Sequence, residues 1–179
     1  MKELTFYIVD VFAEEKYTGN QLAVFRNAQD LTTDIMQQIA REINYSETTF
    51  ILLDTKQNDG FDVRIFTPKE ELPFAGHPTL GTAYIIQREI IQKPIDKVLL
   101  NLKVGQIPVT FSYKDNQADI LFMRQIPPTF GKTPDTKEIA DVLSIRIDDI
   151  DDRFPIREVS TGVPDFMVPL KNMAALKTG

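Results

Sequence analysis

The apolar and polar positions of this 179-residue chain alternate between the period of strands and the period of helices. Residues 32–43 carry apolar side chains at helical spacing, which predicts an amphipathic helix. Apolar, β-branched segments predict strands at residues 4–12, 22–25, 48–53, 61–66, 98–102, 107–113 and 118–123. Further along, the pattern predicts a short helix at 136–143 and strands at 156–159 and 166–170.

A second helix, predicted at residues 77–89, has almost no polar face. Its apolar residues include Leu80, Ala83, Tyr84, Ile85 and Ile86. A helix that is apolar nearly all round is surrounded by protein, so we expect this one at the centre of its domain. Pro78 suits the first position of a helix, which makes His77 the expected N-cap.

The segment 126–131 (IPPTFG) is the expected linker, because two prolines and a glycine break both helix and strand. It separates an N-terminal domain, residues 1–125, from residues 132–179. The second segment is too short to bury a core of its own. We therefore expect it to be the start of an incomplete second domain.

Composition narrows the possible functions. The chain has 26 acidic and 20 basic residues and a net charge of −6, with no basic stripe, which argues against nucleic-acid binding. It has no apolar stretch near the length of a membrane span, and its N-terminus resembles a strand rather than a signal peptide, so we expect a cytoplasmic protein without membrane attachment. With no cysteine and one histidine, thiol chemistry and multi-histidine metal sites are excluded. The groups that remain available for catalysis or ligand binding are carboxylates, hydroxyls, backbone dipoles and one imidazole.

Two positions are candidates for that chemistry. His77 lies at a predicted helix start, where backbone N–H groups can hold a carboxylate and disfavour an imidazolium, although a purely structural cap explains the same spacing. Glu47 lies between a helix and an apolar strand. Partial burial there would raise its pKa and suit it to proton transfer, and a solvated glutamate at a helix end is the simpler alternative.

Five motifs occur in the order found in one protein family. They are VDVFA (9–13), GNQLAV (19–24), SETTF (46–50), RIFTP (64–68) and LPFAGHPTLGTA (72–83). Together they resemble the phenazine biosynthesis-like isomerase family, PhzF. The later segments STGVP (160–164) and VPL (168–170) are similar to the opening of that family's second domain.

The resemblance implies an α+β fold like that of diaminopimelate epimerase, in which each of two pseudo-symmetric domains is a curved antiparallel sheet or barrel wrapped around a central helix. It implies isomerisation without a cofactor or metal, on a small carboxylate-bearing metabolite bound between the domains. Glu47 would shuttle the proton and His77 would assist it. The expected substrate-binding residues are Asn20, Ser46, Gly76 and Pro78.

One departure from the family is the absence of a D-P-x-T-G-S-A-like motif, which opens the central helix of the second domain. The chain is then either a fragment of a longer isomerase or a truncated, inactive protein that serves as a binding or interaction module. We expect no turnover by this chain alone, because one wall of the site cannot orient or desolvate a substrate. We also expect self-association, a homodimer included, through uncovered apolar strands.

Overall fold

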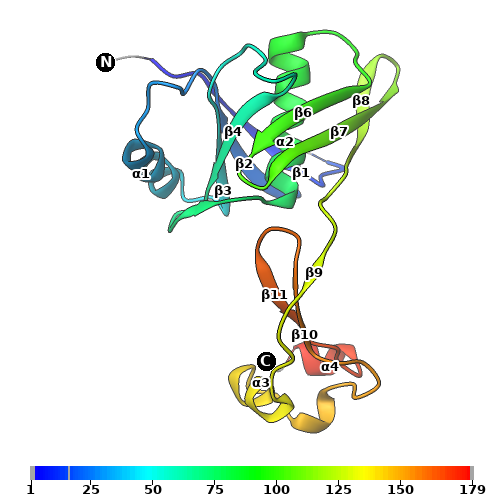
Figure 1. The fold of residues 1–179 in the computed structure, drawn as a ribbon. Coiled ribbons are helices and arrows are strands. Elements are labelled where there is room, and N and C mark those ends of the chain that lie inside the picture. The colour runs from blue at the N-terminus through cyan, green and yellow to red at the C-terminus, as the bar shows by residue number, and fades with distance from the viewer. Residues whose placement is uncertain (1–2, 16, 178–179) are drawn as a thin grey trace. The chain divides into compact units, whose positions relative to one another are not determined.

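The computed structural model describes residues 3–15 and 17–177, which belong to two compact units, residues 1–125 and 126–179 (Figure 1). The strands of the first unit are β1 (Phe6–Val11), β2 (Asn20–Phe25), β3 (Glu47–Ile51), β4 (Phe61–Phe66), β5 (Glu71–Leu72), β6 (Lys97–Leu102), β7 (Gly105–Lys114) and β8 (Gln117–Met123). Its helices are α1 (Thr33–Ile43), α2 (Gly76–Ile85) and a π-helical continuation of α2, η1 (Ile86–Ile91). No helix in the described part of the chain is long and apolar enough to cross a membrane.

The strands form one sheet in the order β1-β2-β3-β4-β6-β7-β8, with β5 paired to β4. An antiparallel sheet was expected, but β2 and β3 are parallel, and so are β4 and β6. The reason is the connections. Parallel neighbours need a crossover, and each of these two pairs is joined through a helix, α1 in the first case and α2 with η1 in the second.

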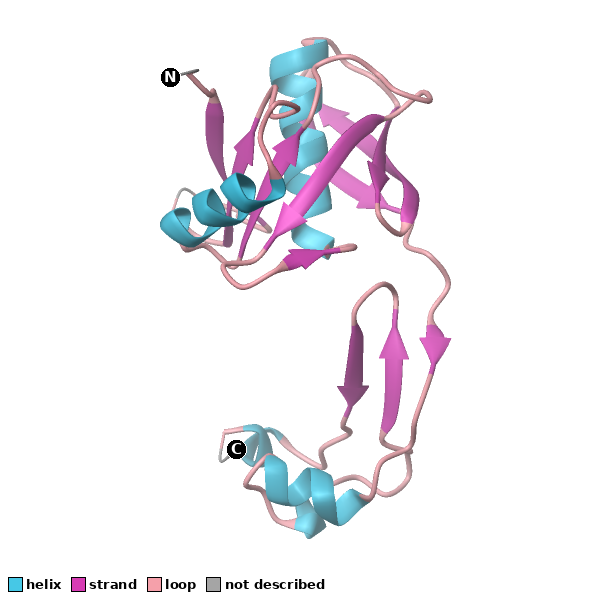
Figure 2. Ribbon diagram, turned by 60° about the vertical axis from the view of Figure 1, so that its left-hand side comes forward, coloured by secondary structure: helices cyan, strands magenta, loops and turns pink. Residues whose placement is uncertain are grey.

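The sheet curves around α2, as Figures 1 and 2 show. This helix contacts strands from the middle of the sheet and also both edge strands, β1 and β8. Most of its side chains are buried, so the central position expected from composition is confirmed. Between β1 and β8 a hollow of about 680 Å³ opens over Leu80 and Gly81 of α2, away from Glu47 and His77.

Helix α1 packs on the outer face of the same sheet. Thr32 caps it by accepting a hydrogen bond from the Ile35 N–H, and Asn44 ends it in the left-handed conformation, which asparagine tolerates well. The cluster beneath α1 contains Ala23, Phe25, Ala28, Met36, Ala40, Phe50 and Phe66. Residues 32–43 therefore form the amphipathic helix that their spacing predicts.

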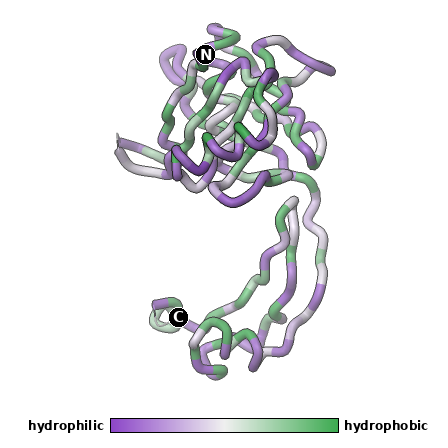
Figure 3. The backbone as a smooth tube through the Cα atoms, turned by 90° about the vertical axis from the view of Figure 1, so that its left-hand side faces the viewer, coloured by the Kyte–Doolittle hydropathy of each residue, from purple (hydrophilic) through white to green (hydrophobic). Residues whose placement is uncertain are grey.

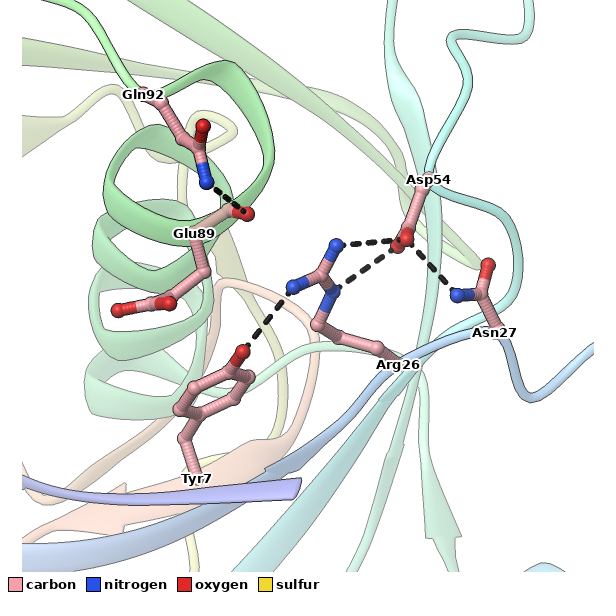
Figure 4. Close-up of polar contacts among 6 residues, drawn as sticks. All are labelled: Tyr7, Arg26, Asn27, Asp54, Glu89 and Gln92. Atoms are coloured by element: carbon pink, nitrogen blue, oxygen red, sulfur yellow. Dashed lines mark hydrogen bonds and ion pairs between the residues drawn. The ribbon is translucent and has the colours of Figure 1, made fainter. Parts of the chain in front are cut away.

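A polar network fastens the end of β2 to the loop after β3 (Figure 4). The Arg26 guanidinium donates two hydrogen bonds to the Asp54 carboxylate, at 3.2 and 2.7 Å, and a third to the Tyr7 hydroxyl. Asn27 donates to the same carboxylate at 2.8 Å. A two-pronged arginine–carboxylate pair fixes direction as well as distance, so this corner of the sheet is firmly held.

The second unit is small. Its elements are β9 (Thr129–Phe130), α3 (Thr136–Val142), the 3₁₀ turn η2 (Ile147–Asp149), β10 (Arg157–Ser160), β11 (Pro164–Met167) and α4 (Met173–Leu176). The segment 126–131, expected to be a linker, contributes β9, which pairs with β10. The prolines at 127 and 128 precede this strand and therefore do not interrupt its pairing. Just after the strand, the Gly131 N–H donates a hydrogen bond to the Glu158 carbonyl.

Few apolar side chains of the second unit are buried. One cluster forms from Ile139, Ala140, Ile150 and Ile156. Hydrophobic positions recur along the strands and helices of this unit in Figure 3. Several are exposed, among them Phe130, Val142, Phe154, Phe166, Met167 and Met173.

Candidate active site

Three polar side chains meet at the N-terminus of the central helix α2. Glu47 is the first residue of β3, Asn20 is the first residue of β2, and His77 is the second residue of α2. His77 Nε2 lies 3.4 Å from Glu47 Oε2, and His77 Nδ1 lies 3.2 Å from Asn20 Nδ2. The structure thus brings together the two expected catalytic residues and one expected substrate-binding residue.

The facing atoms of Glu47 and His77 are buried and lack a hydrogen-bond partner. Their side chains are 17% and 9% exposed, and neither Glu47 Oε2 nor His77 Nε2 makes a hydrogen bond. Burial raises the pKa of Glu47. Burial also lowers the pKa of His77, while a hydrogen bond with the Gln21 backbone works in the opposite direction. A carboxyl that is reluctant to ionise, beside a neutral imidazole, suits transfer of a proton near neutral pH.

The start of α2 differs from the expectation. Ala75, not His77, is the N-cap, and Pro78 is the third helical residue. A proline is tolerated throughout the first turn, because no N–H there needs an intrahelical acceptor. No side chain caps this end. The N–H groups of Gly76 and His77 and the positive end of the helix dipole therefore favour an anion beside Glu47.

A buried hydrogen bond fixes the strand that carries Glu47. Thr49 Oγ1 and Thr82 Oγ1 lie 2.8 Å apart, and both residues are fully buried. The bond ties β3 to α2, since Thr49 points to the same face of the strand as Glu47. Sequence reasoning missed this pair, and the signal it overlooked was a threonine in the middle of a largely apolar helix.

The other expected residues differ in their placement. Gly76 is the first residue of α2 and is partly exposed, and Pro78 is buried in the same turn. Ser46 precedes Glu47 but is exposed and makes no side-chain hydrogen bond within the described part of the chain. Across residues 3–15 and 17–177, no group of three acidic, histidine or cysteine side chains is arranged to hold a metal ion.

Comparisons with known proteins identify relatives over nearly the whole chain. The family model of the phenazine biosynthesis-like proteins, PhzC-PhzF, matches residues 9–178. The trans-2,3-dihydro-3-hydroxyanthranilate isomerase of Pseudomonas aeruginosa is 36% identical over 171 residues, which are 96% of this chain and 59% of the relative. This chain therefore spans about three-fifths of the length of that relative.

Solved structures show the same fold. A predicted epimerase from Pseudomonas aeruginosa superimposes with a TM-score of 0.85 at 34% identity, covering 97% of this chain and 61% of the other. A hydroxyproline epimerase from Agrobacterium vitis superimposes with a TM-score of 0.61 at 12% identity, covering 93% and 52%. At that identity the second likeness shows the fold alone, and with the first it confirms the expected epimerase-like α+β class.

Proposed function

Because this chain belongs to the phenazine biosynthesis-like family, PhzC-PhzF, we propose that it carries the proton-transferring side of an isomerase active site that works without a cofactor. The observation that carries the proposal is the buried contact of Glu47 with His77 at the uncapped start of α2. The named isomerases among its relatives support the reaction class.

Glu47 is the proton carrier in this proposal. As a carboxylate it takes a proton from one carbon of the substrate, and as a carboxylic acid, whose proton can exchange with solvent, it delivers a proton to another carbon of the same molecule while the double bond moves. The product has the same atoms and the same number of electrons as the substrate, so the reaction needs no redox partner. The raised pKa of Glu47 supports this role, because a base and acid in turn works best when its pKa is close to the working pH.

The start of α2 holds the substrate in this proposal. The substrate is a small metabolite with a carboxylate, which the N–H groups of Gly76 and His77 would bind in the field of the helix dipole. This arrangement places the reacting carbon beside Glu47. Burial strengthens these electrostatic contacts, since water does not compete with them.

The test uses a chimera in which this chain is joined to the unmatched part of the Pseudomonas aeruginosa isomerase. We expect the chimera to isomerise trans-2,3-dihydro-3-hydroxyanthranilate in deuterated water with uptake of solvent deuterium, and the chain alone to show no turnover. Glu47→Gln keeps the size of the side chain but cannot change protonation state. It should retain substrate binding and lose about 10²–10⁴-fold in rate.

The matched control is Glu70→Gln, at an exposed glutamate in a turn, which should keep the parent rate. A Glu47→Gln chimera that exchanges the proton as fast as the parent would remove Glu47 from the mechanism. A folded chimera that binds the substrate without converting it would favour the alternative, an inactive binding module.

A further inference from the structure

The side chain of Asn20 contacts the imidazole of His77, and this contact bears on which ring nitrogen carries the proton. We propose that Asn20 is a positioning residue whose amide N–H donates to His77 Nδ1 and thereby keeps the imidazole proton on Nε2, the nitrogen that faces Glu47. The supporting geometry is the 3.2 Å separation of Asn20 Nδ2 and His77 Nδ1, with Nε2 3.4 Å from the carboxylate on the other side of the ring.

The argument begins from the donor. An amide nitrogen donates hydrogen bonds and does not accept them, so the nitrogen it faces must offer a lone pair. In a neutral imidazole one ring nitrogen carries hydrogen and the other does not. Burial keeps His77 neutral by lowering its pKa. If Nδ1 accepts from Asn20, the proton therefore lies on Nε2.

The position of that proton affects Glu47. With hydrogen on Nε2, the ring presents a donor to Glu47 Oε2, which stabilises the carboxylate against the effect of burial. With Nε2 bare, a lone pair would face the carboxylate oxygens and disfavour the ionised base. Asn20 thus acts through His77 on the ionisation of Glu47. Its use in catalysis rests on the proposed function, whereas the tautomer itself does not.

The competing arrangement is well defined. The Gln21 backbone carbonyl favours a proton on the ring, and an Asn20 side chain turned by half a rotation would present its oxygen to an Nδ1–H group. That arrangement would leave Nε2 bare toward Glu47. The two arrangements place the single imidazole proton on different nitrogens, so one measurement separates them.

The measurement is ¹⁵N NMR of the labelled chain at neutral pH. His77 is the only histidine, so two-bond correlations from the ring hydrogens assign both nitrogens without ambiguity. We expect a protonated, pyrrole-type Nε2 and an unprotonated, pyridine-type Nδ1. Asn20→Asp replaces the donor with an acceptor of the same shape. It should draw a proton to Nδ1 and raise the pH at which the ring titrates.

The matched control is Asn116→Asp, in the exposed turn between β7 and β8, which should leave the ring nitrogens unchanged. A pyrrole-type Nδ1 in the parent chain would overturn the proposal, and this spectrum decides even if the Asn20 variants do not fold. A folded Asn20→Asp variant with parent ring shifts would overturn it too. An inactive chimera would count against the proposed function and leave the tautomer result standing.

Discussion

The buried hydroxyl pair of Thr49 and Thr82 allows a quantitative test of how the strand carrying Glu47 is held. Each hydroxyl has the other as its partner, and neither reaches water. Thr82→Val removes one hydroxyl at nearly constant shape and leaves the Thr49 hydroxyl buried without a partner. An unsatisfied buried polar group costs about 1–3 kcal/mol, so Thr82→Val should lower the free energy of unfolding of the first unit by that amount.

The double variant is more informative than either single one. With both hydroxyls gone, two methyl groups meet in an apolar interior, and removing both partners of a hydrogen bond can be nearly neutral. Because the double variant is nearly neutral, the coupling between the two sites should be close to the sum of the two single costs, about 2–6 kcal/mol in a double-mutant cycle. Urea unfolding followed by circular dichroism gives the four free energies, provided that the slope with urea is unchanged.

The control is Thr110→Val, on β7, where the threonine is exposed and its hydroxyl donates to the Phe122 carbonyl at 3.3 Å. Water can replace that bond, so little change is expected. If Thr82→Val and Thr49→Val each cost nothing, or if their costs simply add in the double variant, the hydroxyl pair does not fasten β3 to α2 and the reasoning is wrong.

Three further predictions concern other parts of the chain. Burial raises the pKa of Glu47 above its ordinary 4.5, so between these two pKa values the folded chain binds a proton that the unfolded chain has released. The free energy of unfolding should therefore fall as the pH rises from 4.5 through the folded-state pKa. Glu47→Gln does not titrate, so its stability relative to the parent in urea titrations should increase over that range, and a constant difference would contradict the prediction. Gly81→Ala would place a Cβ 2.7 Å from Leu22 and 2.9 Å from Val11 side-chain atoms. These close contacts should cost about 1–3 kcal/mol, which exceeds the gain of up to about 1 kcal/mol in helix propensity. The urea midpoint of Gly81→Ala should therefore be lower than that of the parent, and an unchanged or higher midpoint would refute this prediction. The exposed apolar side chains of β11 should make the chain self-associate in light scattering, and a stable monomer would count against this.

Local patterns predicted the longer elements, but not their exact limits and not the short elements β5, β9, η2 and α4. The helical spacing of apolar residues in 32–43 predicted α1, because the buried face of a helix requires apolar side chains at that spacing. The apolar character of the segment after His77 predicted α2, because a helix buried on all sides requires apolar side chains all round. The start of α2 was displaced by two residues, since proline is compatible with several positions of the first turn. The π-helical turn η1 was not foreseen, because its hydrogen-bond spacing has no counterpart in the apolar pattern.

The contacts of the site depended on information that local patterns do not contain. Glu47 and His77 could be proposed as separate candidates, but Asn20 and His77 are 57 positions apart in the chain. Nothing in the neighbourhood of either predicts that an amide will reach Nδ1. The hydroxyl pair of Thr49 and Thr82 is similar, since each threonine alone is an ordinary buried residue.

The parallel pairing of β2 with β3 explains why the site exists where it does. Asn20 and Glu47 are the first residues of these strands, and in a parallel pair the first residues lie at the same end, with Leu22 opposite Glu47. In an antiparallel pair the start of one strand would lie beside the end of the other, and Asn20 and Glu47 would be separated by the length of the strand. Helix α1 provides the crossover that makes the pair parallel, and α2 begins at the same end of the sheet with His77. The site is therefore a consequence of topology, because a helix on the outer face of the sheet aligns two strand starts with the first turn of the helix inside.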